Sequence, residues 1–162
     1  MLSSLYSRQS VWFLLLTVFI SVSQISAVYA EPAISSDKQG VAIDGYDPVA
    51  YFVDGKPAPG LEQITHTWQG SIWRFISIEN RDKFSAMPEN YAPQYGGYCA
   101  YAMSGGSFAA GDGERWRIVE NKLYLNNNWF AQKLWIQDIP GNIRDADTHW
   151  SKLKPAPLVG NP

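Results

Sequence analysis

The side chains best suited to bind a soft metal include one closely spaced pair. Cys99 and Met103 are four residues apart, so on a helix their sulfur atoms would share one face. Thiolate, thioether and imidazole donors suit Cu(I), and His66 is a candidate third ligand. Cysteine and methionine are also frequent core residues. The sequence therefore leaves two alternatives for this pair, a copper site or plain packing.

Cys99 is also a candidate for thiol chemistry. It is the only cysteine in the chain, which excludes an internal disulfide. A helix beginning near Tyr95 would lower the pKa of a thiol in its first turns and favour the thiolate. A thiol enzyme or redox protein also needs a base, which His66 or His149 could provide only through the fold. The competing interpretation is an inert buried thiol, because the neighbouring residues are apolar or aromatic.

The carboxylates give weaker support to catalysis. Asp112 and Glu114 flank Gly113 in a polar segment, where solvated loop charge competes with a paired-carboxylate hydrolase. Asp47 lies beside a proline, where aspartate is favoured for its backbone hydrogen bonds. The sequence contains no nucleophile elbow and no phosphate-binding loop. A non-catalytic binding module is therefore favoured over an enzyme.

Composition narrows the range of partners. Arg8 is the only charged residue before Glu31. The rest of the chain contains 12 basic and 15 acidic residues, which gives a net charge of −3, and the basic residues form no cluster. Nucleic acid is excluded as a partner, because phosphate binding needs a localised positive field. Seven tryptophans in 162 residues predict a compact aromatic core, with an aromatic groove for a small ligand as the alternative.

The N-terminus predicts export. Arg8 precedes an apolar run over residues 11–22, and Val28-Tyr29-Ala30 resembles a signal-peptidase site. We expect residues 1–30 to be a signal peptide, cleaved after Ala30, and the protein to be periplasmic or secreted. An uncleaved anchor is the alternative. The remainder contains no further apolar stretch that would span a membrane, and we expect one domain over residues 31–154 and a disordered tail over 155–162.

Hydrophobic periodicity predicts an α+β fold, a small antiparallel sheet built from hairpins and packed with several short helices. Strand-like alternation and turn residues favour a strand over 49–53 and two hairpins. The expected hairpins are 64–68 with 72–76 and 116–119 with 123–126, and the expected helices cover 78–87, 95–103, 129–137 and the segment after Pro140. We expect both hairpins to lie in one sheet.

Several of these segments resemble a known family. The stretch Asp44-Gly45-Tyr46-Asp47-Pro48-Val49-Ala50-Tyr51, the Trp73-Arg74-Phe75 strand and Pro88-Glu89-Asn90-Tyr91 resemble the YHS domain, which is related to the metal-handling TRASH modules. The segment 91–102 is similar to exported bacterial YHS domain-containing proteins in particular. The resemblance covers about residues 42–153. It implies a binding module whose ligand is undetermined.

The chain departs from this family at the positions that would bind a metal. YHS modules of copper-transporting ATPases commonly have cysteines at three positions that correspond here to Ala50, Ile76 and Asn80. Alanine and isoleucine side chains have no lone pair for a metal, and a lone asparagine is a poor ligand for a soft one. If copper binds, it must use other ligands, for which Cys99, Met103 and His66 are the candidates.

Overall fold

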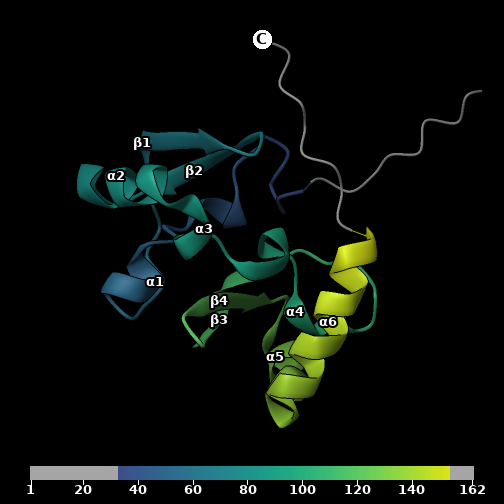
Figure 1. Cartoon of the computed structure of the whole chain (residues 1–162). Coiled ribbons are helices and arrows are strands. Elements are labelled where there is room, and N and C mark those ends of the chain that lie inside the picture. Colours follow the sequence, from purple (N-terminus) through teal and green to yellow (C-terminus); the bar gives the residue numbers. More distant parts are fainter. Residues whose placement is uncertain (1–32, 154–162) are drawn as a thin grey trace, which may run out of the picture.

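A computed structural model describes residues 33–153 of the chain. The predicted signal peptide, its cleavage site and the tail over 155–162 lie outside these residues. Within the described range, no helix is both long and apolar enough to cross a membrane. The elements in chain order (Figure 1) are η1 Ile43–Gly45, α1 Ala50–Val53, β1 Leu61–Trp68, β2 Ser71–Phe75, α2 Ile78–Ala86, α3 Pro88–Tyr91, η2 Gln94–Gly97, α4 Ala100–Ser104, β3 Asp112–Val119, β4 Lys122–Asn126, α5 Trp129–Gln137 and α6 Ile139–Leu153.

Both predicted hairpins are present, and the α+β class is confirmed. Strands β1 and β2 pair antiparallel with His66 opposite Trp73, and β3 and β4 pair with Arg117 opposite Tyr124. Helix α2 begins where predicted, because the Ser77 hydroxyl accepts a 3.1 Å hydrogen bond from the Asn80 N–H.

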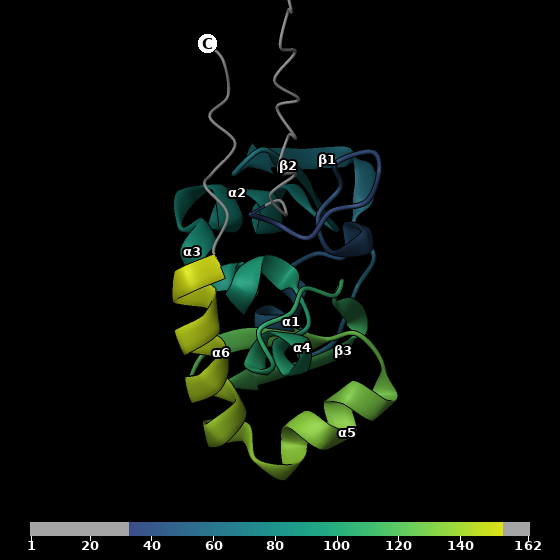
Figure 2. The same ribbon diagram turned by 90° about the vertical axis from the view of Figure 1, so that its right-hand side faces the viewer.

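The expectation of a single sheet is wrong, because each described hairpin forms its own two-stranded sheet (Figure 2). The free edge of β2 pairs with the segment before η1, through an isolated parallel bridge between Val41 and Ile72. The free edge of β4 is occupied in the same way by Cys99, which bridges Leu125. The edges of β2 and β4 are therefore occupied by other segments, and the two hairpins do not pair with each other.

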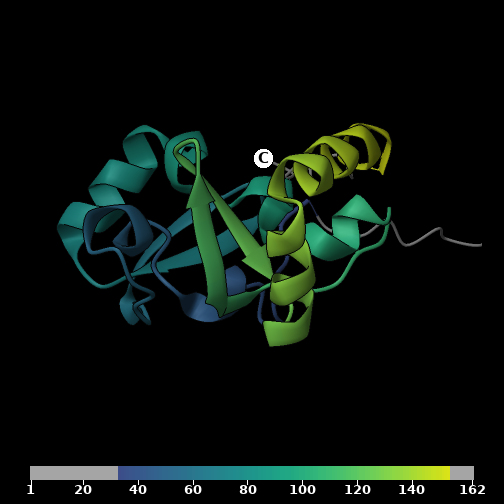
Figure 3. The same cartoon turned by 90° about the horizontal axis from the view of Figure 1, so that it is seen from below.

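Strand β4 nevertheless joins the two halves of the molecule into one packed structure. Its side chains alternate between two faces, as in any strand, and both faces are buried. Figure 3 shows β3 and β4 in the middle of the view, beside α5. Leu123 and Leu125 enter the first core cluster with Trp73 and Phe84. Tyr124 points the other way, into the second cluster, which also contains Met103, Trp135 and Ala146.

The strand predicted over 49–53 is wrong. This segment forms the short helix α1, preceded by a turn in which the Asp47 carboxylate accepts hydrogen bonds from the N–H groups of Val49 and Ala50. Those are the N–H groups that a starting helix leaves unpaired. A short apolar run is compatible with either a buried strand or a buried helix, and the preceding aspartate decides between them.

The helix predicted over 95–103 is also wrong as one continuous element. Tyr95 and Gly96 have φ values of 55° and 63°, in the left-handed region, which interrupts a right-handed helix. Cys99 has a non-helical backbone, with φ −58° and ψ 117°, and α4 begins only at Ala100. Another backbone segment passes close by, since a Cβ atom at Gly96 would collide with the carbonyl oxygen of Ala33.

The C-terminal helices form as predicted, with one difference in α5. The helical spacing of its apolar residues places Phe130, Leu134 and Trp135 on one side, but the Phe130 side chain is 56% exposed and the helix buries Ala131 and Trp135. Helix α6 buries Ala146 and packs Ile143 and Trp150 against the second core cluster, as expected.

Candidate functional site

Cys99 lies in the core, where its thiol is engaged by neighbouring groups. The residue is 1% exposed. Its Sγ atom caps α4 by accepting a hydrogen bond of 3.4 Å from the N–H of Ala102, and its S–H donates to Oδ1 of Asn126 at 3.8 Å. The predicted burial is therefore found, and the position at the start of a five-residue helix is that of a cap.

Asn126, the partner of this thiol, is a polar core residue that the sequence did not single out. It is completely buried, and its Oδ1 atom also accepts a hydrogen bond of 3.3 Å from the N–H of Tyr101. Its Nδ2 atom is one of three buried polar atoms without a hydrogen-bond partner in the described part of the chain, together with Trp135 Nε1 and His149 Nδ1. A buried asparagine at the end of a strand gave no sequence signal distinct from a turn residue.

The three candidate metal ligands are distributed over two regions. Met103 follows Cys99 by one turn, and its N–H donates to the Cys99 carbonyl oxygen at 2.9 Å. Met103 belongs to the second core cluster. His66 lies on β1 and packs edge-on against Phe84 of the first cluster, with ring centroids 6.1 Å apart. Between residues 33 and 153, no three His, Cys, Asp or Glu side chains form a group that could hold a metal ion.

The three positions where the YHS resemblance places cysteines do meet in space, around Asp47. The carboxylate of Asp47 is fully buried. Besides Val49, its oxygens accept hydrogen bonds from the N–H of Ala50 at 3.3 Å, the N–H of Ile76 at 2.9 Å and the side-chain amide of Asn80 at 2.8 Å. Four donors occupy the lone pairs of this carboxylate. In this chain the position holds a satisfied polar cluster, and no oxygen of Asp47 is left for a cation.

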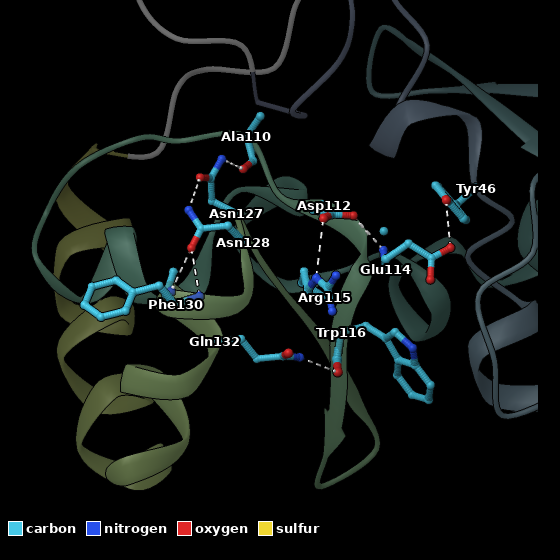
Figure 4. Close-up of polar contacts among 12 residues, drawn as sticks. Tyr46, Ala110, Asp112, Glu114, Arg115, Trp116, Asn127, Asn128, Phe130 and Gln132 are labelled. Carbon is cyan, nitrogen blue, oxygen red and sulfur yellow. Dashed lines mark hydrogen bonds and ion pairs between the residues drawn. The ribbon is translucent and has the colours of Figure 1, made fainter.

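Asp112 and Glu114, the other carboxylate pair of interest, are also occupied (Figure 4). Glu114 accepts a hydrogen bond of 2.9 Å from the hydroxyl of Tyr46, which together with burial raises the pKa of that tyrosine. Asp112 pairs with Arg115 at 3.7 Å and accepts from the N–H of Glu114. Both residues lie on β3 and stabilise its irregular start.

Three buried tyrosines show how strongly the core disfavours charge. Burial raises the pKa of Tyr51, whose hydroxyl donates to the carbonyl oxygen of Gly113. Burial, followed by a hydrogen bond to Asp147, raises the pKa of Tyr95. Burial and the charges of Asp147 and Glu120 raise the pKa of Tyr124 to about 12.

A cleft with aromatic walls opens between the β1–β2 turn and α6, and we name it the Trp68–Trp150 cleft. Its volume is about 340 Å³, within the range of small-ligand sites. Both tryptophans are partly exposed. Its aromatic and polar lining residues come from β1, the hairpin turn, α3, η2 and α6, and they are Trp68, Gln69, Glu89, Gln94, Tyr95 and Trp150.

Three polar side chains of this cleft have no partner among the residues that the structure describes. Gln69, Glu89 and Gln94 make no side-chain hydrogen bond or ion pair with any residue that the structure describes. A second cavity of about 400 Å³ lies beside Ile139 and Ile143. There two of the three charged side chains are engaged, because Asp147 accepts a hydrogen bond from Tyr95 and Arg144 pairs with Asp145, and Glu120 is the one without a partner among the described residues. The Trp68–Trp150 cleft is therefore the better candidate for ligand recognition.

No protein-family model, no curated protein and no solved structure matches this chain.

Proposed function

We propose that this chain is an exported, non-catalytic binding module of the YHS type, and that its ligand occupies the Trp68–Trp150 cleft. The observation that carries the proposal is the combination of aromatic walls with three planar polar side chains that have no partner in the described protein. Ligand sites combine apolar and aromatic walls with a few polar groups that set orientation. The residues that line the cleft are far apart in the chain, so the cleft forms only when the protein folds.

The YHS assignment is supported by the Asp47 cluster. Ala50, Ile76 and Asn80 are separated in sequence, yet all three donate hydrogen bonds to one carboxylate. In a family that binds a metal through side chains at these three positions, the positions must lie close together in the fold. In this chain the Asp47 carboxylate is the centre of the cluster. The proposed ligand is therefore something other than a thiolate-bound metal.

The soft-metal alternative, copper bound by Cys99, Met103 and His66, stays a prediction with less support from the geometry. The Cys99 sulfur is already engaged by the Ala102 N–H and the Asn126 amide. His66 packs against Phe84 on another element. The thiol-enzyme alternative needs an accessible thiol, and Cys99 is 1% exposed.

The test is a ligand screen followed by amide chemical-shift mapping on the exported protein. We expect a ligand to shift resonances of Gln69, Gln94 and Trp150 and to leave those of Trp129 unchanged, because Trp129 is 64% exposed and outside the cleft. Trp129→Ala is the matched control for Trp150→Ala, which should abolish binding. Ligands that shift only resonances around the second cavity, at Ile139 and Ile143, would refute the assignment of the cleft.

Export is proposed on the N-terminal sequence alone. Removal of residues 1–30 would give a chain that begins at Glu31. Intact-mass measurement on protein from the periplasm or medium should show this N-terminus. Full-length chain in the membrane fraction would support the anchor alternative instead.

A further inference from the structure

The charge of the Trp68–Trp150 cleft restricts the class of its ligand. Of the described residues that line it, Glu89 is acidic and none is basic. An anionic ligand would meet no opposite charge and would have to approach a carboxylate. The ligand is therefore neutral or cationic.

The remaining polar groups favour a neutral ligand rich in hydroxyl groups. Gln69 and Gln94 each present one amide, which offers donors and an acceptor side by side, and Glu89 offers two acceptor oxygens. A hydroxyl group both donates and accepts hydrogen bonds, so two adjacent hydroxyls can pair with one amide or one carboxylate group. A simple organic cation would use acceptors only and leave the amide N–H groups unpaired. The faces of Trp68 and Trp150 can pack on the C–H face of a sugar ring.

Gln69 occupies a backbone position that does not favour glutamine. It precedes Gly70 in the two-residue β1–β2 turn, and both residues have positive φ, 49° and 78°. Such turns prefer Asn-Gly, because asparagine tolerates the left-handed region better than glutamine. Glu120 has the same conformation in the β3–β4 turn, so what distinguishes Gln69 is its place in the lining of the cleft. The longer glutamine side chain lines the cleft.

We propose that the Trp68–Trp150 cleft binds a neutral saccharide of one or two rings and that Gln69 is a specificity-determining residue for it. This inference rests on the proposed function, since it names the ligand class of the same cleft. The cleft volume of about 340 Å³ is suited to a ligand of this size.

The experiment combines a screen with a matched pair of turn variants. The exported protein is applied to an array of neutral glycans, and hits are titrated by tryptophan fluorescence beside tetramethylammonium and sulfate. Gln69→Asn restores the preferred turn residue, so we expect it to raise the urea midpoint while weakening saccharide binding about tenfold through one lost hydrogen bond. Glu120→Asn changes the equivalent position of the β3–β4 turn, with φ of 50°, and should stabilise the fold without changing affinity.

The outcomes separate the two proposals. Saccharide binding that Gln69→Asn weakens and Glu120→Asn does not supports both. Binding of tetramethylammonium at the cleft with no glycan bound would overturn the saccharide class and keep the cleft as a ligand site. Equal affinity of Gln69→Asn and the unaltered protein would overturn the role of Gln69. No ligand of any class at the cleft would overturn both proposals.

Discussion

The side-chain amide of Asn80 donates a 2.8 Å hydrogen bond to Oδ2 of Asp47, and this bond connects α2 to the turn before α1. The same oxygen accepts from the N–H of Ile76, at the end of β2. A carboxylate with no exposure to water is tolerated only where such donors replace its hydration. Asp47 therefore holds three elements of the first half together.

Replacing Asp47 should destabilise the protein strongly. In Asp47→Asn one oxygen becomes an NH₂ group that faces hydrogen-bond donors, so buried N–H groups lose their acceptor. We expect the free energy of unfolding to fall by roughly 2 to 4 kcal/mol, measured by urea denaturation. Asp54→Asn is the control, because Asp54 is exposed, and it should change stability by less than about 0.5 kcal/mol. Equal effects of the two substitutions would contradict the role given to Asp47.

The convergence on Asp47 also predicts a gain of function. If the YHS resemblance is correct, the variant Ala50→Cys, Ile76→Cys, Asn80→Cys should acquire a thiolate site around this carboxylate. We expect it to take up about one equivalent of Cu(I) or Zn²⁺, measured by metal analysis after dialysis. Asn80→Cys alone is the control and should bind no stoichiometric metal. A folded triple variant without bound metal would count against the resemblance.

The sequence was a good guide where local chemistry determines the element. The two hairpins and α2 follow from period-two alternation, paired turn residues and the Ser77 cap. It was a poor guide where tertiary contacts decide. Residues 50–53 form a helix because Asp47 accepts hydrogen bonds from the N–H groups of Val49 and Ala50, and the segment 95–103 is interrupted because the backbone near Gly96 must pass close to Ala33.

The candidate cleft could not be predicted from the sequence as a set. Trp68 and Trp150 differ in the sequence from no other tryptophan of the chain, and the distance of more than eighty positions between them carries no signal of proximity. Gln69 and Gln94 carry no sequence signal that separates them from other polar residues of turns and loops. Only the packing of α6 against η2, through Tyr95 and Trp150 with ring centroids 6.0 Å apart, brings these side chains to one place.

The surroundings of Cys99 predict that its thiol reacts slowly and has a structural role. Native protein should react with iodoacetamide far more slowly than protein unfolded in urea, because Sγ is buried and engaged. Cys99→Ser should reduce stability by about 1 to 3 kcal/mol, since a hydroxyl is shorter and pairs imperfectly with the Asn126 amide.

Metal content distinguishes this structural role from copper binding. If packing is the whole role of Cys99, then Cys99→Ser and Met103→Leu leave the metal content of purified protein unchanged. Loss of stoichiometric Cu(I) in Cys99→Ser, with a weaker effect in Met103→Leu, would establish the copper site. Rapid alkylation of the native, metal-free protein would instead favour thiol chemistry.

The buried tyrosines predict instability at alkaline pH. The pKa values of Tyr51, Tyr95 and Tyr124 are raised in the folded protein, that of Tyr124 to about 12, whereas an unfolded tyrosine titrates near 10. Below pH 10 both states hold these protons and the stabilisation is complete. Above pH 10 only the unfolded state releases them, so the free energy of unfolding falls as pH rises.

The size of this effect can be tested with one conservative substitution. Each tyrosine that stays protonated in the folded state lowers the free energy of unfolding by about 1.4 kcal/mol per pH unit above 10. Tyr124→Phe removes one such group, so alkaline unfolding followed by circular dichroism should become less steep and shift to higher pH. The phenolate absorbance of the buried tyrosines should rise together with unfolding in the unaltered protein. Titration of every tyrosine near pH 10 with the fold intact would contradict the burial of these side chains.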